Sequence, residues 1–402
     1  MYDLLVTNGR VIDPSQNIDG QMDVAIQDGK ISRIAKDISV DDAKETMDVN
    51  GCIVIAGMID VHTHVYAGVN QNGEEPDVAG VRSGVTTIVD AGSSGCDTFG
   101  GFPKYILPNA KTEIRPFLHI CRTGLASTPD IMAETSIDLE NTIRVVQESN
   151  GVIKGIKARM VSPALEIFGM EMPKLAKRAA RETGVRLMVH IGDTENRYDE
   201  SVISKLLPIL DEGDIVTHLF TANKGGIIDS DGKLVPEAKE AKERGVWLDT
   251  AHGRSNFSFD IGDKVLDQGL IPHCISTDLT VPGRINTVHS MTEMMTRFLA
   301  MGFKLEEVIN MCTINPASAI GEQDRLGTLH AGKQADLSIL KIENGDWVVY
   351  DVLNNPRKID KAVVPVACVK EGIKYAADWG CLLYTSDAAD EGLGVDLGGR
   401  RI

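Results

Sequence analysis

The residues best suited to chemistry include Asp60-Val61-His62-Thr63-His64, where one residue separates two histidines. In an extended strand, residues i and i+2 point to the same face, so His62 and His64 would present two imidazoles on one side. Two neutral imidazoles on one face form a chelate for Zn²⁺ or a similar ion. Because such pairs also occur by chance as core or surface histidines, this pair alone does not establish a metal site.

Three further polar side chains directly follow apolar runs of the chain. His190 ends the run Leu187-Met188-Val189, His218 ends residues 215–217, and Asp278 ends residues 274–277. Taken singly, each is as readily a polar strand terminus or a satisfied core histidine as a ligand. If these runs are parallel strands of a barrel, their ends converge on one rim. Their coincidence with His62 and His64 therefore predicts a shared site.

Lys157 follows Gly155-Ile156 within another apolar run. A buried lysine is costly unless it is neutralised or paired. The residue is then either an ordinary surface lysine, or an amine that carries a carbamate and bridges two metals as a carboxylate. Lys154 is the competing lysine; it lies three residues earlier and is expected to point to the opposite face of the strand.

Eight apolar segments alternate with helix-like stretches after residue 52, and the clearest helices are expected at 173–183 and 235–244. This alternation predicts an α/β fold, a (β/α)₈ TIM-like barrel. A doubly wound open sheet is the alternative, but no G-x-G-x-x-G or P-loop follows any of these segments. The expected strands are 53–62, 86–90, 114–120, 151–159, 186–191, 215–219, 246–251 and 272–277.

The two ends of the chain have a different character, with short β-prone runs and turns. Asn8-Gly9 and Asp28-Gly29 predict hairpin turns near the start, and short strands return after Gly327. We expect residues 1–55 and 320–380 to form one composite β-sandwich domain beside a barrel of residues 56–319. Residues 381–402 resemble the in-frame translation of a sequencing-library adaptor, or else form a disordered tail, and are left out of the predicted fold.

Composition narrows the class of protein. The 402 residues carry a formal net charge of -17, which disfavours nucleic acid and anionic membranes as partners. The 7 cysteines are odd in number and include no C-x-x-C pair, which argues against a disulfide framework and favours a reducing cytoplasm. The N-terminus shows neither a signal peptide nor a membrane helix. We expect a small-molecule substrate and a possible homo-oligomer.

The sequence resembles the amidohydrolase superfamily, and within it the dihydroorotase-related deacetylase-type metallohydrolases. The resemblance covers residues 3–378 and is carried by three motifs, the opening Thr7-Asn8-Gly9-Arg10-Val11-Ile12-Asp13, the segment 56–64 around the histidine pair, and the closing segment 327–337. It implies two divalent metal ions, with zinc as the default and manganese, cobalt or iron as alternatives. It also implies a ligand set: His62 and His64 for the first metal, His190 and His218 for the second, a carbamate on Lys157 as the bridge, and Asp278 as first-metal ligand and proton shuttle.

One departure from the family pattern bears on the substrate. Dihydroorotases usually carry an arginine two residues after the second histidine of the pair, and this chain has Tyr66 there. Because an arginine holds a carboxylate bidentately, its loss counts against dihydroorotase proper. Each substrate-side candidate has an ordinary surface or ion-paired role as its alternative; the candidates are Tyr66, Arg122, Arg159, His252 and Arg284.

The predicted reaction is hydrolysis of an acyl group, most simply acetyl, from a small amino-acid or hydroxy-acid derivative. A metal-activated water would attack the carbonyl, and Asp278 would pass its proton to the leaving group. Ring opening of a cyclic amide, such as a hydantoin or dihydropyrimidine, is the alternative enzyme. A non-catalytic scaffold that has lost its ligands is a third possibility, which the complete ligand set disfavours.

Overall fold

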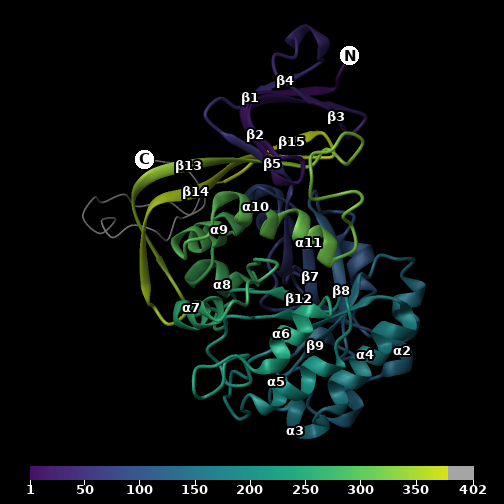
Figure 1. Ribbon diagram of the computed structural model, residues 1–402. Helices are drawn as coiled ribbons and strands as arrows, with labels where there is room; N and C mark the ends of the chain where they lie inside the picture. Colours follow the sequence, from purple (N-terminus) through teal and green to yellow (C-terminus); the bar gives the residue numbers. More distant parts are fainter. Residues whose placement is uncertain (379–402) are drawn as a thin grey trace.

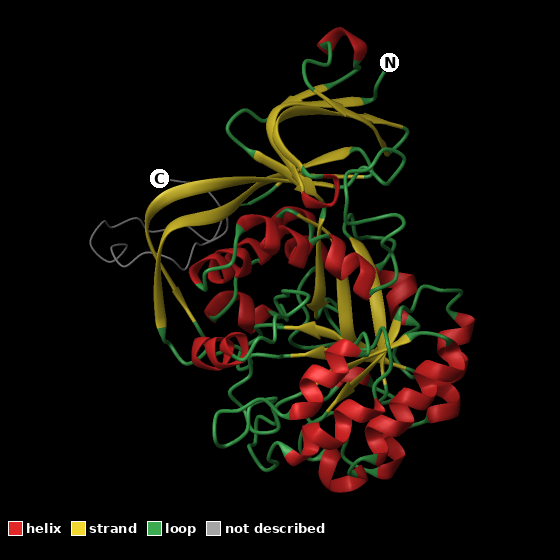
Figure 2. Ribbon diagram, in the orientation of Figure 1, coloured by secondary structure: helices red, strands yellow, loops and turns green. Residues whose placement is uncertain are grey.

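A parallel sheet of seven strands forms the centre of the computed structural model, which describes residues 1–378. The strands lie side by side in chain order, and most connections between them contain helices that pack around the outside of the curled sheet (Figures 1 and 2). This α/β architecture agrees with the predicted one. The strands are β6 (Met58–Thr63), β7 (Val85–Gly95), β8 (Glu113–His119), β9 (Gly155–Arg159), β10 (Arg186–His190), β11 (Ile215–Thr217) and β12 (Trp247–Asp249).

The eighth expected strand, 272–277, makes only isolated contacts with its neighbours. Cys274 forms a parallel bridge with Asp249 of β12, and Leu279 forms one with Thr63 of β6. This segment therefore connects the two edge strands of the seven-stranded sheet. It brings Asp278 beside β6, where the Asp278 amide donates to the backbone carbonyl of His62 at 2.7 Å.

The helices bury one apolar face each against this sheet. In α4 the buried face includes Met172, Ala176 and Ala180, and Gly184 ends the helix in the left-handed region at φ 70°. The two clearest predicted helices are confirmed as α4 and α6. The helices are α1 (Pro76–Ala79), α2 (Leu139–Glu148), α3 (Ala164–Phe168), α4 (Glu171–Thr183), α5 (Ser201–Leu206), α6 (Pro236–Glu243), α7 (Phe259–Asp267), α8 (Val281–Asn286), α9 (Met291–Ala300), α10 (Leu305–Cys312) and α11 (Ile314–Ala319).

Strands from both ends of the chain pair in a second sheet, in the order β15-β14-β13-β5-β1-β2-β3, with β4 on β1. The purple and yellow strands that lie together in Figure 1 are these two ends. The ends therefore join in one sheet; its two-layer sandwich form and the domain boundaries stay predictions. The strands are β1 (Leu4–Asp13), β2 (Ile18–Gln27), β3 (Lys30–Ala35), β4 (Thr46–Asp48), β5 (Ile53–Ala56), β13 (Leu337–Tyr350), β14 (Pro356–Lys370) and β15 (Ile373–Ala376).

Two local predictions are wrong in detail. The expected strand 53–62 is divided at Gly57, because β5 pairs with β1 and β13 whereas β6 pairs with β7. Asn8-Gly9 is no hairpin turn. Strand β1 continues through it with a shifted register, and Asn8 adopts φ 62°. An Asn-Gly pair supplies the left-handed conformation that a bulge needs as well as the one that a turn needs.

The antiparallel pair β13 and β14 extends beyond its sheet as a long arm along the helices of the parallel sheet (Figure 1). The Val363 amide donates to Thr296 Oγ1 of α9 at 3.0 Å. At the tip, Asp351 caps α7 by accepting the Phe259 amide, and the Val352 amide donates to the Phe257 carbonyl at 3.1 Å. Part of the expected β domain thus supports the segment that precedes α7.

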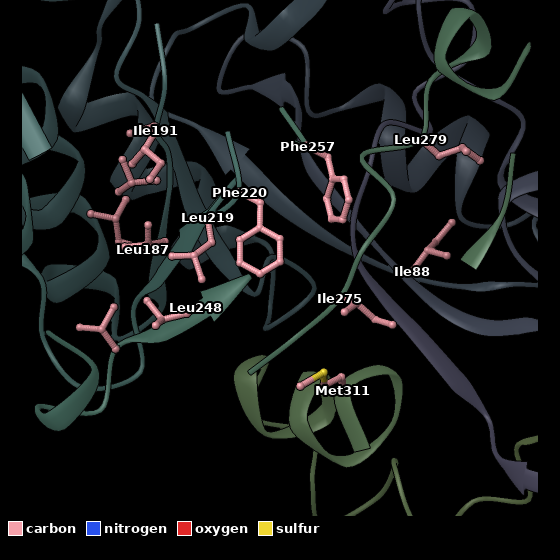
Figure 3. Close-up of a cluster of buried hydrophobic side chains, with 14 of the residues drawn as sticks. Ile88, Leu187, Ile191, Leu219, Phe220, Leu248, Phe257, Ile275, Leu279 and Met311 are labelled. Atoms are coloured by element: carbon pink, nitrogen blue, oxygen red, sulfur yellow. The ribbon is translucent and has the colours of Figure 1, made fainter. Parts of the chain in front are cut away.

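The main hydrophobic core lies between the parallel sheet and its helices. Figure 3 shows Phe220 and Phe257 within this cluster, with ring centroids 5.7 Å apart, near Leu219 and Ile275. All four side chains are fully buried. Their burial fixes the backbone that carries the strand ends.

None of the helices within residues 1–378 combines the length and apolar character needed to cross a bilayer. The six cysteines of that range are free thiols. The adaptor-like segment 381–402 lies outside the described residues.

The buried Arg297 of α9 joins the arm to the parallel-sheet region. It pairs with Glu293 at 2.8 Å, and it donates to the carbonyls of Tyr350 at 2.9 Å and Thr287 at 2.7 Å. Arg297→Met leaves a buried carboxylate unpaired, so we expect the free energy of unfolding in urea to fall by about 3–5 kcal/mol. The exposed pair of Arg144 with Glu148 provides the control, and Arg144→Met should cost less than about 1 kcal/mol. Equal losses in the two variants would contradict this role.

Candidate metal centre

Four side chains from two strand ends, those of β6 and β11, and from the segment after β12 meet in one buried cluster. His62 Nε2 lies 3.5 Å and His64 Nε2 lies 3.2 Å from Asp278 Oδ1. His218 Nε2 lies 4.0 Å from Asp278 Oδ2. Ligand atoms of His62, His218 and Asp278 all lie within 4.8 Å of one another, close enough to hold one ion.

His190 and Lys157 also lie in this cluster, beside the four side chains above. The His190 and His218 rings pack edge to face with centroids 4.2 Å apart, and Lys157 Nζ lies 3.2 Å from His62 Nε2. All six predicted ligands thus gather at the carboxyl ends of the strands, as a barrel rim requires. The competing Lys154 is wrong for this site, since its Nζ pairs with Glu322 at 2.7 Å on the other side of the strand.

The tautomers of two histidines follow from their partners. Thr217 Oγ1 donates to Asp249 Oδ2 at 2.6 Å, so it accepts at 2.9 Å from His62 Nδ1–H. His218 Nδ1 faces the Ala251 carbonyl at 2.8 Å, which can only accept. Both rings therefore direct the lone pair of Nε2 toward Asp278. Nε2 of His218 is buried and makes no hydrogen bond within the described residues, as expected for a metal ligand.

The other two histidines are also held. His190 Nε2 donates to the Gly192 carbonyl at 3.2 Å, which leaves the lone pair on Nδ1. His64 Nδ1 lies 3.0 Å from Ser93 Oγ. Burial lowers the pKa of His218 to about 4 and the pKa values of His62 and His190 well below their usual value. Neutral imidazole is the form that binds metals.

Lys157 is almost completely buried, at 1% exposure, and its Nζ has only the His62 ring and Met188 Sδ within hydrogen-bond reach. Burial lowers the pKa of its amine to about 7. The Cβ and Cγ of Lys157 pack against Gly92, where an added Cβ would lie 2.7 Å from both. The lysine therefore occupies a fitted channel, and a substantial fraction of its amine is uncharged at neutral pH.

The backbone turns sharply at two of these positions. His218 has φ 75° and Asp278 has φ 50°, in the left-handed region that side chains with a Cβ seldom adopt. Such strain costs of order 1–3 kcal/mol per residue and persists where the surroundings impose it. A Cβ on Gly253 would collide with the Asp278 carboxylate, so a glycine is required beside it.

A buried polar network lies beneath the cluster. Asp249 accepts from Thr217 and from Ser276 at 2.8 Å, and Asp60 accepts from the Thr277 hydroxyl at 2.6 Å and from the His62 amide at 3.2 Å. Burial raises the pKa of Asp249 to about 6 and that of Asp60 to about 7. Through these hydrogen bonds, Asp60 and Asp249 hold in place the backbone segments that carry the histidines and Asp278.

The cluster opens into a cavity of about 220 Å³. Of the predicted substrate-side residues, only Arg159 lines it. Sequence reasoning missed Arg254 and Asn256, whose only signal was their position in the loop after β12 and His252. The lining residues are His62, His64, Asn70, Asn72, Leu125, Thr128, Lys157, Arg159, His190, Thr194, Arg254, Ser255, Asn256, Asp278 and Thr280.

The other four candidates lie elsewhere. The Tyr66 hydroxyl donates to the Thr98 carbonyl at 2.7 Å, and Arg122 pairs with Asp97 at 2.8 Å on the exposed side of the protein. His252 is buried and stacks on Phe257. Arg284 lies 3.8 Å from Glu74. Each side chain contacts residues away from the cavity, and none of the four is among the residues that line it.

Comparison with known proteins follows the geometry. Residues 53–374 match the amidohydrolase family. The chain belongs to the amidohydrolase family. It is similar to a protein named deacetylase from Brucella anthropi, 32% identical over 90% of this chain and 90% of the relative, and to one from Enterococcus faecalis, 31% identical over 93% and 99%. This amidohydrolase is therefore a hydrolase of carbon–nitrogen bonds.

Two solved structures share the whole architecture of this amidohydrolase. An adenine deaminase superimposes with a TM-score of 0.85 at 29% identity, covering 94% of this chain and 100% of its own. A dihydroorotase superimposes with a TM-score of 0.82 at 29% identity, covering 93% and 99%. The predicted family is confirmed, and the fold accommodates proteins named for different reactions.

Thr217 is the residue through which Asp249 fixes the His62 ring. Thr217→Val keeps the shape but leaves Nδ1–H of His62 without an acceptor, so we expect Zn²⁺ affinity to fall about 10–100-fold. Competition with a chromophoric chelator measures it, and Thr217→Ser, which keeps the hydroxyl, should retain near-native affinity. Nitrogen-15 NMR of the metal-free protein should show the Nδ1–H tautomer of His62 in the native and serine forms. Unchanged affinity in the valine variant would exclude this role.

Proposed function

We propose that this amidohydrolase is a metal-dependent deacetylase that removes an acetyl group from a small amino-acid or hydroxy-acid derivative. The observation that supports it most is the convergence of the imidazole rings of His62, His64, His190 and His218 with Asp278 and a buried lysine. The names of the similar deacetylases support the acyl group, which the geometry alone does not specify.

The residues present fit two divalent ions, for which zinc suits the imidazole-rich set. His62, His64 and Asp278 would hold one ion, His190 and His218 the other, with a carbamate on Lys157 between them. Ions bound there would supply a water of lowered pKa and polarise the scissile carbonyl.

Lys157 is suited to carry the carbamate. Its amine attacks the carbon of CO₂ and loses a proton, which leaves an anion in place of a cation. Only the uncharged amine is nucleophilic, and the burial that lowers the pKa of Lys157 to about 7 makes that form abundant at neutral pH. The product adds a carboxylate-like ligand to a cluster that otherwise has one carboxylate, Asp278.

Asp278 is suited to move the proton. Its side chain is 14% exposed to the cavity, while its Oδ1 lies within 3.5 Å of the two β6 histidines. A carboxylate in this position accepts a proton from the attacking water and delivers it to the leaving nitrogen or oxygen. The backbone strain at Asp278 holds the carboxylate at the junction between cluster and cavity.

Ring opening of a cyclic amide is the second candidate. A dihydroorotase from Aquifex aeolicus is 26% identical over 88% of this chain, and a dihydroorotase structure shares the fold. Tyr66 disfavours dihydroorotase itself, because its hydroxyl donates to the Thr98 carbonyl and it does not line the cavity. A panel of N-acetyl amino acids, O-acetyl hydroxy acids, hydantoins and dihydropyrimidines separates the two, and the deacetylase proposal expects turnover of the acetyl compounds alone.

The two neighbouring lysines provide a matched test of the centre. With zinc and bicarbonate supplied, Lys157→Ala should bind fewer than two equivalents of metal and lose at least about 100-fold in kcat/KM, since losing a ligand should cost at least as much as losing an outer partner. Lys154→Ala should keep native metal content and activity, because Lys154 pairs with Glu322 away from the cluster. Metal analysis and initial rates measure both. Full metal content in Lys157→Ala would refute the bridge.

Asp278→Asn tests the proton transfer. The amide keeps the size but not the basicity, so kcat should fall about 10²–10⁴-fold. Single-turnover rates measure the chemical step separately from release. A rate within threefold of native would assign the proton to another group.

Removing metal with a chelator should abolish turnover in the native protein, and added zinc should restore it.

A further inference from the structure

The charged groups on the cavity wall outside the metal cluster are both cations. They are Arg159, which ends β9, and Arg254, in the loop after β12. Among residues 1–378, Asp278 is the only acid that lines the cavity, and it belongs to the cluster. This wall contrasts with a chain whose formal net charge is -17, so it forms a local positive site in an acidic protein.

Arg159 is held in place by a buried acid. Its Nη1 lies 3.2 Å from Asp130 Oδ1, and Asp130 Oδ2 lies 3.2 Å from His119 Nε2. Burial alone would favour the protonated acid, but Arg159 and His119 hold the pKa of Asp130 below its usual range. Asp130 is therefore an anion that orients the guanidinium. Because a guanidinium has five N–H donors, the pair leaves others free for a ligand.

Arg254 has no carboxylate partner among the described residues. Its side chain is exposed and lines the cavity, and its Cγ packs over Gly283 of α8, where an added Cβ would lie 3.6 Å away. The arm supports the end of this loop through the bond from the Val352 amide to the Phe257 carbonyl. Arg254 is thus a cation on a supported loop that no acid of the described chain neutralises.

Asn256 adds a neutral donor to the same wall. Asn223 Nδ2 donates to the Ser255 carbonyl and, at 3.1 Å, to Asn256 Oδ1. Thr221 Oγ1 also donates to that oxygen, at 3.3 Å. Because two donors occupy Oδ1, the orientation of the Asn256 amide is fixed. Its NH₂ group makes no hydrogen bond within the described residues, although the residue lines the cavity and is only 4% exposed.

We propose that Arg254, Arg159 and Asn256 form a donor wall that binds the carboxylate of the substrate. Arg254 is its main contact, Arg159 is a positioned second cation, and the Asn256 NH₂ group is a third donor. The inference rests on the proposed deacetylase function and narrows its substrates to acetylated acids with a free carboxylate. Neutral analogues leave the Arg254 guanidinium, the remaining N–H donors of Arg159 and the Asn256 amide without an anion, which costs binding. An anion at this wall places the acetyl end of a short molecule toward the cluster.

The test compares N-acetyl amino acids with their C-terminal carboxamides, which have the same shape without the charge. For the native protein loaded with zinc, we expect kcat/KM to favour the acid by about 10–100-fold. Arg254→Met should lose most of that preference by slowing the acid, with the carboxamide changed less than threefold. Asp130→Asn should weaken the preference through a higher KM for the acid at unchanged kcat. Arg144→Met, on the outer face of α2, is the matched control and should behave as native.

A binding measurement separates the two levels of the proposal. N-ethyl amino acids replace the acetyl carbonyl by a methylene group and cannot be hydrolysed, and calorimetry compares them with their carboxamides on the same proteins. Equal turnover and equal binding of acid and carboxamide would overturn the carboxylate site while leaving the deacetylase function intact. If no acetyl compound is turned over, the deacetylase function fails, and charge-selective binding that Arg254→Met abolishes would still support the anion site.

Discussion

The structure depends on burying three imidazoles, those of His62, His190 and His218, and one amine, that of Lys157, so that burial opposes their charged forms. Each side chain would be a solvated cation or a free hydrogen-bonding group at the surface, and burial removes that solvation. The pKa of Lys157 at about 7 and that of His218 at about 4 express this cost. Buried ring nitrogens whose lone pairs accept no hydrogen bond are suited to bind cations. The same burial makes the lysine amine more nucleophilic, so one constraint underlies both the proposed metal binding and the proposed carbamate.

The fold meets this constraint by separating two tasks. Short, fully buried strands bring the ligands to one rim, and the acids beneath them, Asp60 and Asp249, satisfy the polar backbone and ring atoms that the strand ends expose. The loops that follow the strands form the cavity. The β13–β14 arm supports one of these loops from the second sheet, so strands distant from the cluster stabilise part of the cavity wall.

Much of the fold could be predicted from short-range pattern, which also marked the histidines and Asp278 of the cluster, whereas Lys157 was assigned to it only through the family resemblance. The side-chain period of two placed His62 and His64 on one face, and a polar residue at the end of an apolar run marked His190, His218 and Asp278. The donor wall could not be predicted in this way. Arg254 and Asn256 lie in a loop, where no period relates sequence position to direction, and only tertiary contacts decide which arginine faces the cavity.

The same reason explains why Tyr66, Arg122 and Arg284 were misleading. Tyr66 and Arg122 follow strand ends and Arg284 lies in α8, but partners distant in sequence contact all three: the Thr98 carbonyl, Asp97 and Glu74. Asn8-Gly9 is a strong local signal for a hairpin turn, but the pair forms a bulge within β1. The strand continues through it because β1 has a partner strand on each side. A local sequence signal thus limits the conformations and contacts that a residue can have, and residues distant in sequence decide which of them it adopts.

The contact between Arg284 and Glu74 joins the segments that follow β6 and Asp278. These segments can vary without altering the cluster. The Glu74 amide donates to the His64 carbonyl at 2.9 Å, and the Val281 amide donates to the Asn72 carbonyl at 3.0 Å. The loops after β6 and after Asp278 are therefore tied to each other and, by their first residues, to the cluster. A substitution at their tips alters the mouth of the cavity, while the backbone beside the ligands stays fixed by the strands. An adenine deaminase and a dihydroorotase can share this fold for that reason. Under the proposed function, the cluster supplies the chemistry, and the side chains that the loops present would select the molecule that is held there.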